Sequence, residues 1–266
     1  MQVTFATAPG GAAAPNEDWV GSTPNVVVVL DGVTVPSMMG TGCEHGTPWY
    51  VRQLGTHILA AVENAPATAL TGLLATAISA VAALHEGACQ LGHIGTPSAA
   101  VGILRRNAET IDYLLMADVT IVIDDGRGLL IFTDDRVEKT RRFSLQADDS
   151  PAARAANIAT HRTRFRNQPG GYWVAASDPA AAMEAVTGSL PSSTGRRAAL
   201  LTDGAACAVS PYELMDWEAA LSLIEQNGPC ALIDQVRRAE LADPDSDRWP
   251  RYKVSDDATV ALCLLP

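Results

Sequence analysis

Three short apolar segments, far apart in the chain, each adjoin an aspartate, and this feature most constrains the fold. V-V-V-V-L-D-G ends in Asp31-Gly32, A-L-L-T-D-G ends in Asp203-Gly204, and S-D-D-A-T-V-A-L carries Asp256-Asp257 at its start. Such apolar runs bounded by turn residues are typical of buried strands. A fourth acidic element, Asn16-Glu17-Asp18, precedes the first strand. Strand ends can converge at one edge of a sheet, where carboxylates repel each other unless a cation neutralises them.

This arrangement predicts a site for hard cations. Carboxylate oxygens with retained waters are the ligands that Mg²⁺ or Mn²⁺ prefers, whereas zinc favours nitrogen and sulfur. Two such ions can share an aspartate, lower the pKa of a bridging water and clamp a phosphoryl group for in-line attack. Each Asp-Gly pair alone is foremost a turn signal, so only the complete set carries this interpretation.

Charge and composition exclude several other classes of protein. Nineteen Lys and Arg against thirty Asp and Glu give a formal net charge of −11, so we expect no nucleic-acid partner, because binding phosphates needs an excess of basic residues. The first residues lack the basic and apolar runs of a signal peptide. The uncharged stretch 65–84 has its large residues at helical spacing along one side, which favours a buried helix over a membrane span. We therefore expect a cytoplasmic protein with no membrane partner.

The cysteines and histidines predict no soft-metal site. No two of the five cysteines lie within four residues of each other, and no His-Glu-x-x-His spacing occurs. The odd count and wide spacing of the cysteines favour reduced thiols in a reducing compartment.

The order of the predicted elements favours an α+β fold. Strands are expected at 26–30, 98–105, 110–116, 119–124, 128–132, 172–176, 198–202 and 259–265, and helices at 47–63, 67–90, 211–226 and 229–242. The four strands between 98 and 132 are separated by turn residues and predict an antiparallel meander. Strands and helix pairs in this order suggest two sheets layered between helices in one domain.

The segment 136–166 differs from the rest of the chain, because it holds eight of the nineteen basic residues. Two interpretations stay open. The segment can be a solvated helix with flanking loops, or it can form an electropositive wall that faces an anionic ligand.

The acidic elements, in this order, resemble those of the metal-dependent protein phosphatases of type 2C, the PPM family. The resemblance covers nearly the whole chain and implies one PPM-type phosphatase domain over residues 1–266. The implied fold is a four-layer α/β/β/α sandwich, with a central antiparallel β-sandwich flanked by helix pairs. It rests on Asn16-Glu17-Asp18, Asp31-Gly32, T-P-S-A-A-V-G-I-L from Thr96, Met116-Ala117-Asp118, Thr202-Asp203-Gly204 and Asp256-Asp257-Ala258-Thr259.

The resemblance also implies a role for individual residues. Asp31 corresponds to the aspartate that bridges two metal ions, and the Gly32 carbonyl to a ligand of one of them. Asp203 and Asp256 correspond to ligands of the other ion, and Asp118 to a residue of a third, weaker metal. Glu17 and Asp18 correspond to the acidic pair that holds metal-bound waters. Asp257, where many members have Asn, is interpreted as a cap beside the ligand Asp256.

Two departures from the family pattern concern the substrate phosphate. The family's phosphate-binding Arg is replaced by Ala13, and the His that follows Asp-Gly in many members is replaced by Val33. His45 is a candidate replacement for the proton donor, although a lone loop histidine is more often a surface residue. The phosphate contact could come from one of Arg141, Arg142, Arg162 and Arg164.

The leading hypothesis is a Mg²⁺- or Mn²⁺-dependent phosphomonoester hydrolase with two or three ions and a metal-bridged hydroxide. Its default substrate, by resemblance, is phosphoserine or phosphothreonine in proteins. The two departures keep two alternatives open. One is a phosphatase of a small phosphorylated metabolite, and the other is a phosphatase-like module that binds a phosphoprotein without turnover.

Overall fold

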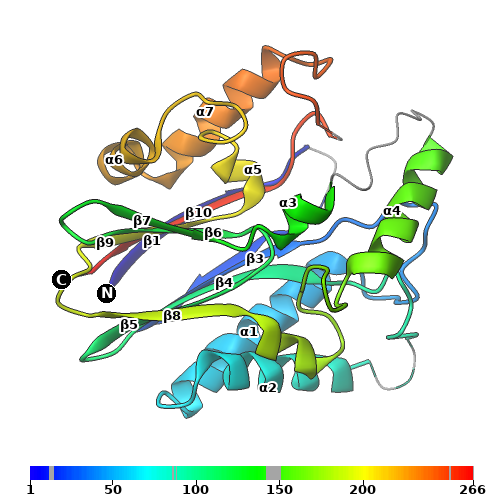
Figure 1. Cartoon of the computed structure of the whole chain (residues 1–266), viewed down its shortest axis with the longest axis horizontal. Coiled ribbons are helices and arrows are strands. Elements are labelled where there is room, and N and C mark those ends of the chain that lie inside the picture. Colours follow the sequence, from blue (N-terminus) through cyan, green and yellow to red (C-terminus); the bar gives the residue numbers. More distant parts are fainter. Residues whose placement is uncertain (12–14, 86, 88, 142–150, 252, 266) are drawn as a thin grey trace.

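Two five-stranded antiparallel sheets form the centre of the part of the chain that the structure describes (Figure 1). The computed structural model describes residues 1–266 except 12–14, 86, 88, 142–150, 252 and 266. The first sheet consists, in spatial order, of β1 (Gln2–Ala8), β10 (Ala258–Leu264), β9 (Arg197–Leu201), β6 (Thr120–Asp124) and β7 (Leu129–Thr133). The second consists of β2 (Trp19–Ser22), β3 (Val26–Gly32), β4 (Ala99–Arg106), β5 (Thr110–Met116) and β8 (Val186–Pro191).

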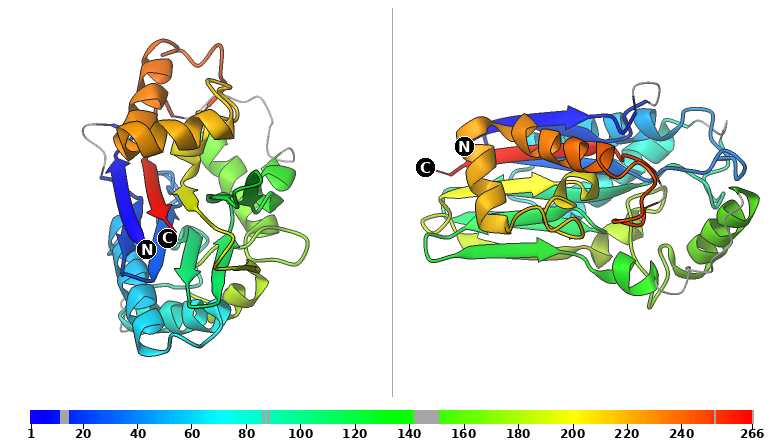
Figure 2. Two further views of the ribbon diagram at one scale, coloured as in Figure 1. Left: turned by 90° about the vertical axis from the view of Figure 1, so that its left-hand side faces the viewer. Right: turned by 90° about the horizontal axis from the view of Figure 1, so that it is seen from above.

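Helix pairs cover the outer faces of both sheets. The helices α1 (Thr47–Asn64) and α2 (Leu70–Ala83) pack on the second sheet, whereas α6 (Trp217–Asn227) and α7 (Pro229–Leu241) pack on the first. The end-on view shows the four layers one above another (Figure 2). The expected α+β fold, a four-layer α/β/β/α sandwich, is therefore confirmed. The remaining helices are α3 (Arg136–Arg141), α4 (Pro151–Phe165), the 3₁₀ helix η1 (Pro179–Glu184) and α5 (Asp203–Ala206).

The strand β3 is apolar on both faces because it lies between two layers of core. Val26, Val28 and Leu30 pack against α1 and α2. Val27 and Val29 point the other way, into the core between the sheets. A strand covered on both faces needs no polar alternation, which explains the unbroken aliphatic run in the sequence.

The predicted four-stranded meander over 98–132 is wrong. β4 and β5 form a hairpin in the second sheet, but β6 and β7 form a hairpin in the first. The chain crosses between the sheets at residues 117–119. Ala117 there adopts a positive φ of 59°, and the side chains of Ala117 and Val119 fill the core between the sheets. The crossing places Asp118 at the end of the sandwich.

The strand predicted at 172–176 is also not formed. Tyr172 and Ala175 make only isolated bridges, to Arg166 and Ala99. The side chain of Asn167 instead satisfies Val174, since its amide donates to the Val174 carbonyl at 3.1 Å and accepts from the Val174 N–H at 2.8 Å. A side chain thus takes the hydrogen bonds that a neighbouring strand would have made.

Two helices begin or end away from the predicted residues, and three strands were not predicted. α2 ends at Ala83, and α6 begins at Trp217, where Asp216 accepts a hydrogen bond from the Ala219 N–H at 2.8 Å and caps the helix.

The strands that the sequence did not predict are β1, β2 and β8, which all lie at sheet edges. No helix among the described residues is long and apolar enough to cross a membrane.

Candidate metal centre

The acidic residues predicted from the sequence lie at one end of the sandwich. β3 and β5 both pair antiparallel with β4, so they run in the same direction and carry Asp31 and Asp118 to the same end. In the other sheet Leu201 pairs with Val260, so the end of β9 lies beside the start of β10. Asp203 and Asp256 therefore reach the same region. Figure 1 shows this end of the sheets opposite the two chain termini.

The pKa of Asp31 indicates that these carboxyl groups influence one another electrostatically. The pKa of the half-buried Asp31 carboxyl is raised well above its ordinary value, first by burial and then by the negative charges of Asp203, Asp18, Asp118 and Asp256. Carboxylates this close to each other resist ionisation unless a positive charge compensates them. The five acidic side chains thus form one electrostatic cluster, which we call the acidic centre.

Asp18 is the most buried member of the acidic centre, with 7% of its surface exposed. Burial raises the pKa of its carboxyl to about 8, against hydrogen bonds that lower it. One oxygen, Oδ2, accepts from the Thr202 hydroxyl at 2.9 Å. The other, Oδ1, is buried without a hydrogen-bond partner among the described residues. A buried carboxylate oxygen of this kind needs a water or a cation, so this observation fits the all-oxygen donor set of a hard metal ion.

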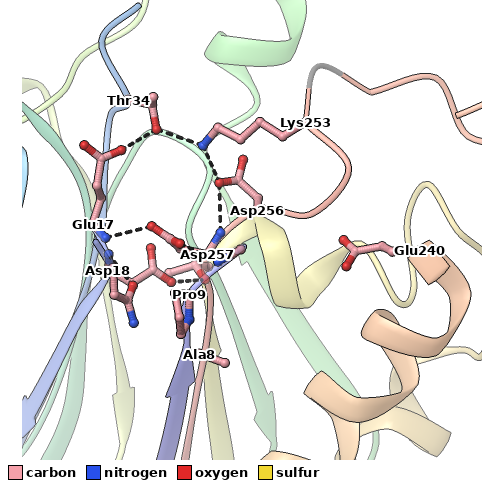
Figure 3. A network of polar contacts seen from close by, with 12 residues as sticks. Ala8, Pro9, Glu17, Asp18, Thr34, Glu240, Lys253, Asp256 and Asp257 are labelled. Atoms are coloured by element: carbon pink, nitrogen blue, oxygen red, sulfur yellow. Dashed lines mark hydrogen bonds and ion pairs between the residues drawn. The ribbon is translucent and has the colours of Figure 1, made fainter. Parts of the chain in front are cut away.

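Glu17 lies next to Asp18 and faces the loop after β3 (Figure 3). Its half-buried carboxyl has a raised pKa because of burial, and it accepts a hydrogen bond from the Thr34 hydroxyl. The Gly32 N–H donates to the Glu17 carbonyl at 3.1 Å. A Cβ at Gly32 would lie 2.3 Å from that carbonyl oxygen. Glycine at this position therefore allows the Glu17 backbone to approach the end of β3.

Asp257 braces the acidic centre. It is buried, and its carboxylate accepts from the Gly10 and Glu17 N–H groups at 2.7 Å each. It thereby ties the segments before β2 and after β1 to the start of β10, and its interpretation as a helix or turn cap stays a prediction. A Cβ at Gly204 would lie 2.0 Å from the Asp257 carbonyl oxygen. This close approach explains why glycine follows Asp203.

Lys253 is a residue of this site that the sequence analysis missed. Its Nζ lies 2.6 Å from Oδ1 of Asp256 and donates to the Thr34 hydroxyl at 2.8 Å (Figure 3). Although burial lowers the pKa of Lys253, the Asp256 carboxylate raises it above the ordinary value. The spacing of three residues before Asp256 was a weak signal for this contact. The exposed Lys253 side chain thus places a positive charge directly on the carboxylate of Asp256, a predicted metal ligand.

Two arginines of the basic segment, Arg162 and Arg166, connect α4 and the residue after it to other parts of the chain. Arg162 is buried, and its Nη2 donates to the Thr34 carbonyl at 2.7 Å. Arg166 donates to the Thr96 carbonyl at 3.2 Å, and Arg164 lies over the Phe165 ring at 4.9 Å. A fully solvated helix is therefore wrong for Arg162. Arg142 lies outside the described residues, as does Ala13, and the structure does not describe the side chain of Arg141. The electropositive wall stays a prediction.

The structure places His45 in a second cluster. Its ring stacks on Trp49 with the centroids 4.1 Å apart, and its Nδ1 lies 3.6 Å from the thiols of both Cys43 and Cys89. These contacts involve no member of the acidic centre. Together with His85, the three residues hold possible metal-ligating atoms within 4.8 Å of one another. The sequence analysis predicted no soft-metal site from local spacing, but the fold brings together two pairs of possible ligands that are about forty residues apart in the sequence.

Comparison with known proteins supports the fold. No protein-family model and no curated relative matches the chain. Among solved structures, the chain is similar to the serine/threonine phosphatase Stp1 from Staphylococcus aureus, with 15% identity, a TM-score of 0.59, and coverage of 100% of this chain and 95% of that chain. The Mycobacterium tuberculosis serine/threonine phosphatase PstP/Ppp gives 16% identity, a TM-score of 0.57, and coverage of 99% and 98%.

A third solved structure contains metal. The catalytic domain of the serine/threonine protein phosphatase PstP, in complex with two manganese ions, gives 14% identity, a TM-score of 0.55, and coverage of 98% of this chain and 96% of that chain. These likenesses cover the full chain from end to end. They show that it has the fold of bacterial serine/threonine phosphatases, as the resemblance to the type 2C family implied.

Proposed function

We propose that the chain is a metal-dependent phosphomonoester hydrolase that acts on phosphoserine or phosphothreonine in proteins. One observation carries this proposal: the ends of strands from both sheets bring acidic side chains together around Asp31. The unpartnered oxygen of Asp18 supports a cation in this place. The fold is shared with serine/threonine phosphatases, one of which was solved with two manganese ions.

The resemblance to the type 2C family suggests which residues would bind each Mg²⁺ or Mn²⁺ ion. We propose that Asp31 is shared by two ions, that the Gly32 carbonyl binds one, and that Asp203 and Asp256 bind the other. Glu17 and Asp18 would orient waters around them, and Asp118 would take part in a third site. When bound, such ions lower the pKa of water and neutralise phosphoryl oxygens.

Neighbouring residues hold the carboxyl groups that would surround the ions. Thr34 fixes the Glu17 carboxyl by donating a hydrogen bond to it, and Thr202 does the same for Asp18. Asp257 holds the Glu17 backbone through its N–H. We propose that Lys253 leaves Asp256 when a cation binds there, since the two cations would compete for the same carboxylate. Its ammonium group would then be available to the substrate phosphate, in place of the missing arginine.

A direct test is Mn²⁺-dependent release of p-nitrophenol from p-nitrophenyl phosphate. We expect Asp31→Asn and Asp203→Asn to lower kcat at least about 100-fold, because each removes charge that holds the metal ions. Asp216→Asn is a matched control. It changes the same functional group at the cap of α6, and Asn caps a helix as well as Asp does. Full turnover in both site variants would overturn the proposal.

A small phosphorylated metabolite is the second candidate substrate. It is favoured because Arg162 and Arg166 are engaged with backbone carbonyls and do not replace the phosphate-binding arginine. Parallel turnover of phosphopeptides and of a phosphometabolite panel separates the two. Preference for peptides supports the protein phosphatase. Absence of turnover, with Mn²⁺ binding retained in calorimetry, supports a phosphoprotein-binding module instead.

A further inference from the structure

A second cluster of possible metal ligands lies outside the acidic centre. It contains two thiols and two imidazoles, and one ligand atom from each residue lies within 4.8 Å of all the others: Cys43, His45, His85 and Cys89. We infer that these four residues form a structural zinc site. The inference does not depend on the proposed phosphatase function, because it uses different residues and different donor chemistry.

Three sulfur–nitrogen distances in the cluster fit a tetrahedral zinc ion. The Cys43 sulfur lies 3.6 Å from Nδ1 of His45 and 3.7 Å from Nδ1 of His85, and the Cys89 sulfur lies 3.6 Å from Nδ1 of His45. Zn–S bonds of about 2.3 Å and Zn–N bonds of about 2.0–2.1 Å place sulfur and nitrogen about 3.5 Å apart around a tetrahedral ion. Two thiolates and two imidazoles are also a donor set that selects zinc over Mg²⁺ or Mn²⁺.

The backbone holds both halves of the cluster in position. The Gln90 N–H donates to the Gly42 carbonyl at 2.7 Å, which joins the segment after β3 to the segment after α2. Gly42 has a φ of 65°, and a Cβ there would lie 2.5 Å from the His93 Cβ. The His45 N–H also points to the Cys43 sulfur at 3.4 Å. Such N–H donors stabilise a thiolate ligand.

Aromatic packing fixes the imidazoles. His45 stacks on Trp49, and His85 meets both rings edge-on with centroids 5.1 and 5.2 Å away. His85 is 4% exposed. Glu44 Oε1 lies 4.0 Å from Nε2 of His45, on the side of the ring away from its ligand atom. Four protein ligands leave no open position on a tetrahedral ion, so the site is structural and not catalytic.

The position of the thiol and imidazole cluster indicates which segments a bound zinc ion would connect. Residues 33–46 connect Asp31-Gly32 to α1, and Cys43 and His45 lie at the far end of this loop. His85 and Cys89 follow the last turn of α2. A zinc ion would therefore clamp the loop that leaves the acidic centre to the end of the α1–α2 helix pair.

The test begins with the full chain expressed in zinc-containing medium and purified under reducing conditions. We expect one zinc per chain by elemental mass spectrometry, released when an organomercurial blocks the thiols. Replacement by Co²⁺ should give the intense visible bands of tetrahedral cobalt and a thiolate-to-cobalt charge-transfer band. These readouts need no variant, so they hold even where a substitution prevents folding.

Variants then assign the ligands. Cys43→Ser and His85→Asn should lose the zinc and lower the melting temperature. Cys230→Ser should keep the zinc and the wild-type melting temperature, because Cys230 is an exposed thiol on α7. Asp31→Asn should also keep the zinc, which separates this site from the acidic centre. Absence of tetrahedral cobalt in the wild-type chain, zinc retained in Cys43→Ser, or a Cys43–Cys89 disulfide in the reduced preparation would overturn the inference.

Discussion

Replacing Asp18 by asparagine should make the metal-free protein more stable and weaken its response to Mn²⁺. The introduced side-chain amide keeps an oxygen for the Thr202 hydroxyl, which donates to Asp18 at 2.9 Å. The amide nitrogen takes the place of the buried oxygen that has no partner among the described residues. The substitution thus changes the charge and leaves the shape almost the same.

The expected gain follows from the pKa of Asp18, which burial raises from 3.8 to about 8. At pH 7, taking this carboxyl into the folded state costs about 4 kcal/mol relative to a neutral side chain. Proton sharing with neighbouring carboxyls and entry of water reduce the cost, so we expect a gain of about 1 to 4 kcal/mol. For a chain of this size, each kcal/mol raises the melting temperature by about 2 to 4 °C.

The assay is thermal unfolding of both proteins in chelator between pH 5 and 8, followed by titration with Mn²⁺. Because the pKa of Asp18 is higher in the folded state, folding favours the protonated carboxyl. The stability of the wild-type protein that depends on this proton is fully present below about pH 4 and is lost as the pH rises through about 8. The difference in the free energy of unfolding between Asp18→Asn and wild type should therefore increase with pH, by up to about 1.4 kcal/mol per pH unit. Saturating Mn²⁺ should close it, because the variant binds the metal about 10- to 100-fold more weakly.

Asp112→Asn is the control with the opposite sign. Burial raises the pKa of Asp112, but hydrogen bonds from Ser189 and Arg105 outweigh this effect and hold the pKa below its ordinary value. Arg105 is 6% exposed and pairs with Asp112 at 2.9 Å, so this substitution should cost about 1 to 3 kcal/mol. If Asp18→Asn also destabilised the metal-free protein, or if its gap narrowed as the pH rose, the electrostatic account of the acidic centre would be refuted.

Three further outcomes are expected at the same site. Lys253→Met removes the ammonium group 2.6 Å from Asp256, so calorimetry should show about tenfold tighter Mn²⁺ binding, while kinetics should show a higher KM for the phosphorylated substrate. Asp257→Ala removes the acceptor of two backbone N–H groups and should cost about 1 to 3 kcal/mol in denaturant unfolding, with a smaller loss for Asp257→Asn. Gly204→Ala would place a Cβ 2.0 Å from the Asp257 carbonyl oxygen, and it should lower both the melting temperature and Mn²⁺ affinity.

The sequence predicted strands well where burial alone decides them. β3, β9 and β10 are aliphatic because core lies on both of their faces, and their bounds agree with the expectation to within one or two residues. The edge strands depend on their partners. β8, for example, has the sequence V-T-G-S-L-P and forms by pairing with β5. Its composition alone resembles a turn, and no local signal identifies its partner.

The same difference between local and tertiary signals applies to the acidic centre and to the thiol and imidazole cluster. The acidic centre could be predicted because each aspartate lies at a strand end or within two residues of one, which is a local feature, and the order of these positions resembles a known family. The thiol and imidazole cluster has the local spacings Cys-x-His and His-x₃-Cys, neither of which is a zinc motif by itself. Only the tertiary structure brings the two pairs together. The contact between Lys253 and Thr34, 219 residues apart, was invisible for the same reason.

The loop of residues 33–46 connects the two clusters physically. Near its start, the Thr34 hydroxyl contacts both Glu17 and Lys253, and the Thr34 carbonyl accepts from Arg162 of α4. Near its end, Cys43 and His45 contact the residues that follow α2. A loop fixed at both ends has fewer conformations open to it than a loop fixed only at its start, so the residues between Thr34 and Cys43 would lose less order when the far end is also held. A zinc ion at the inferred site would restrict this loop without competing for the oxygen atoms of the acidic centre, because it would bind thiolates and imidazoles.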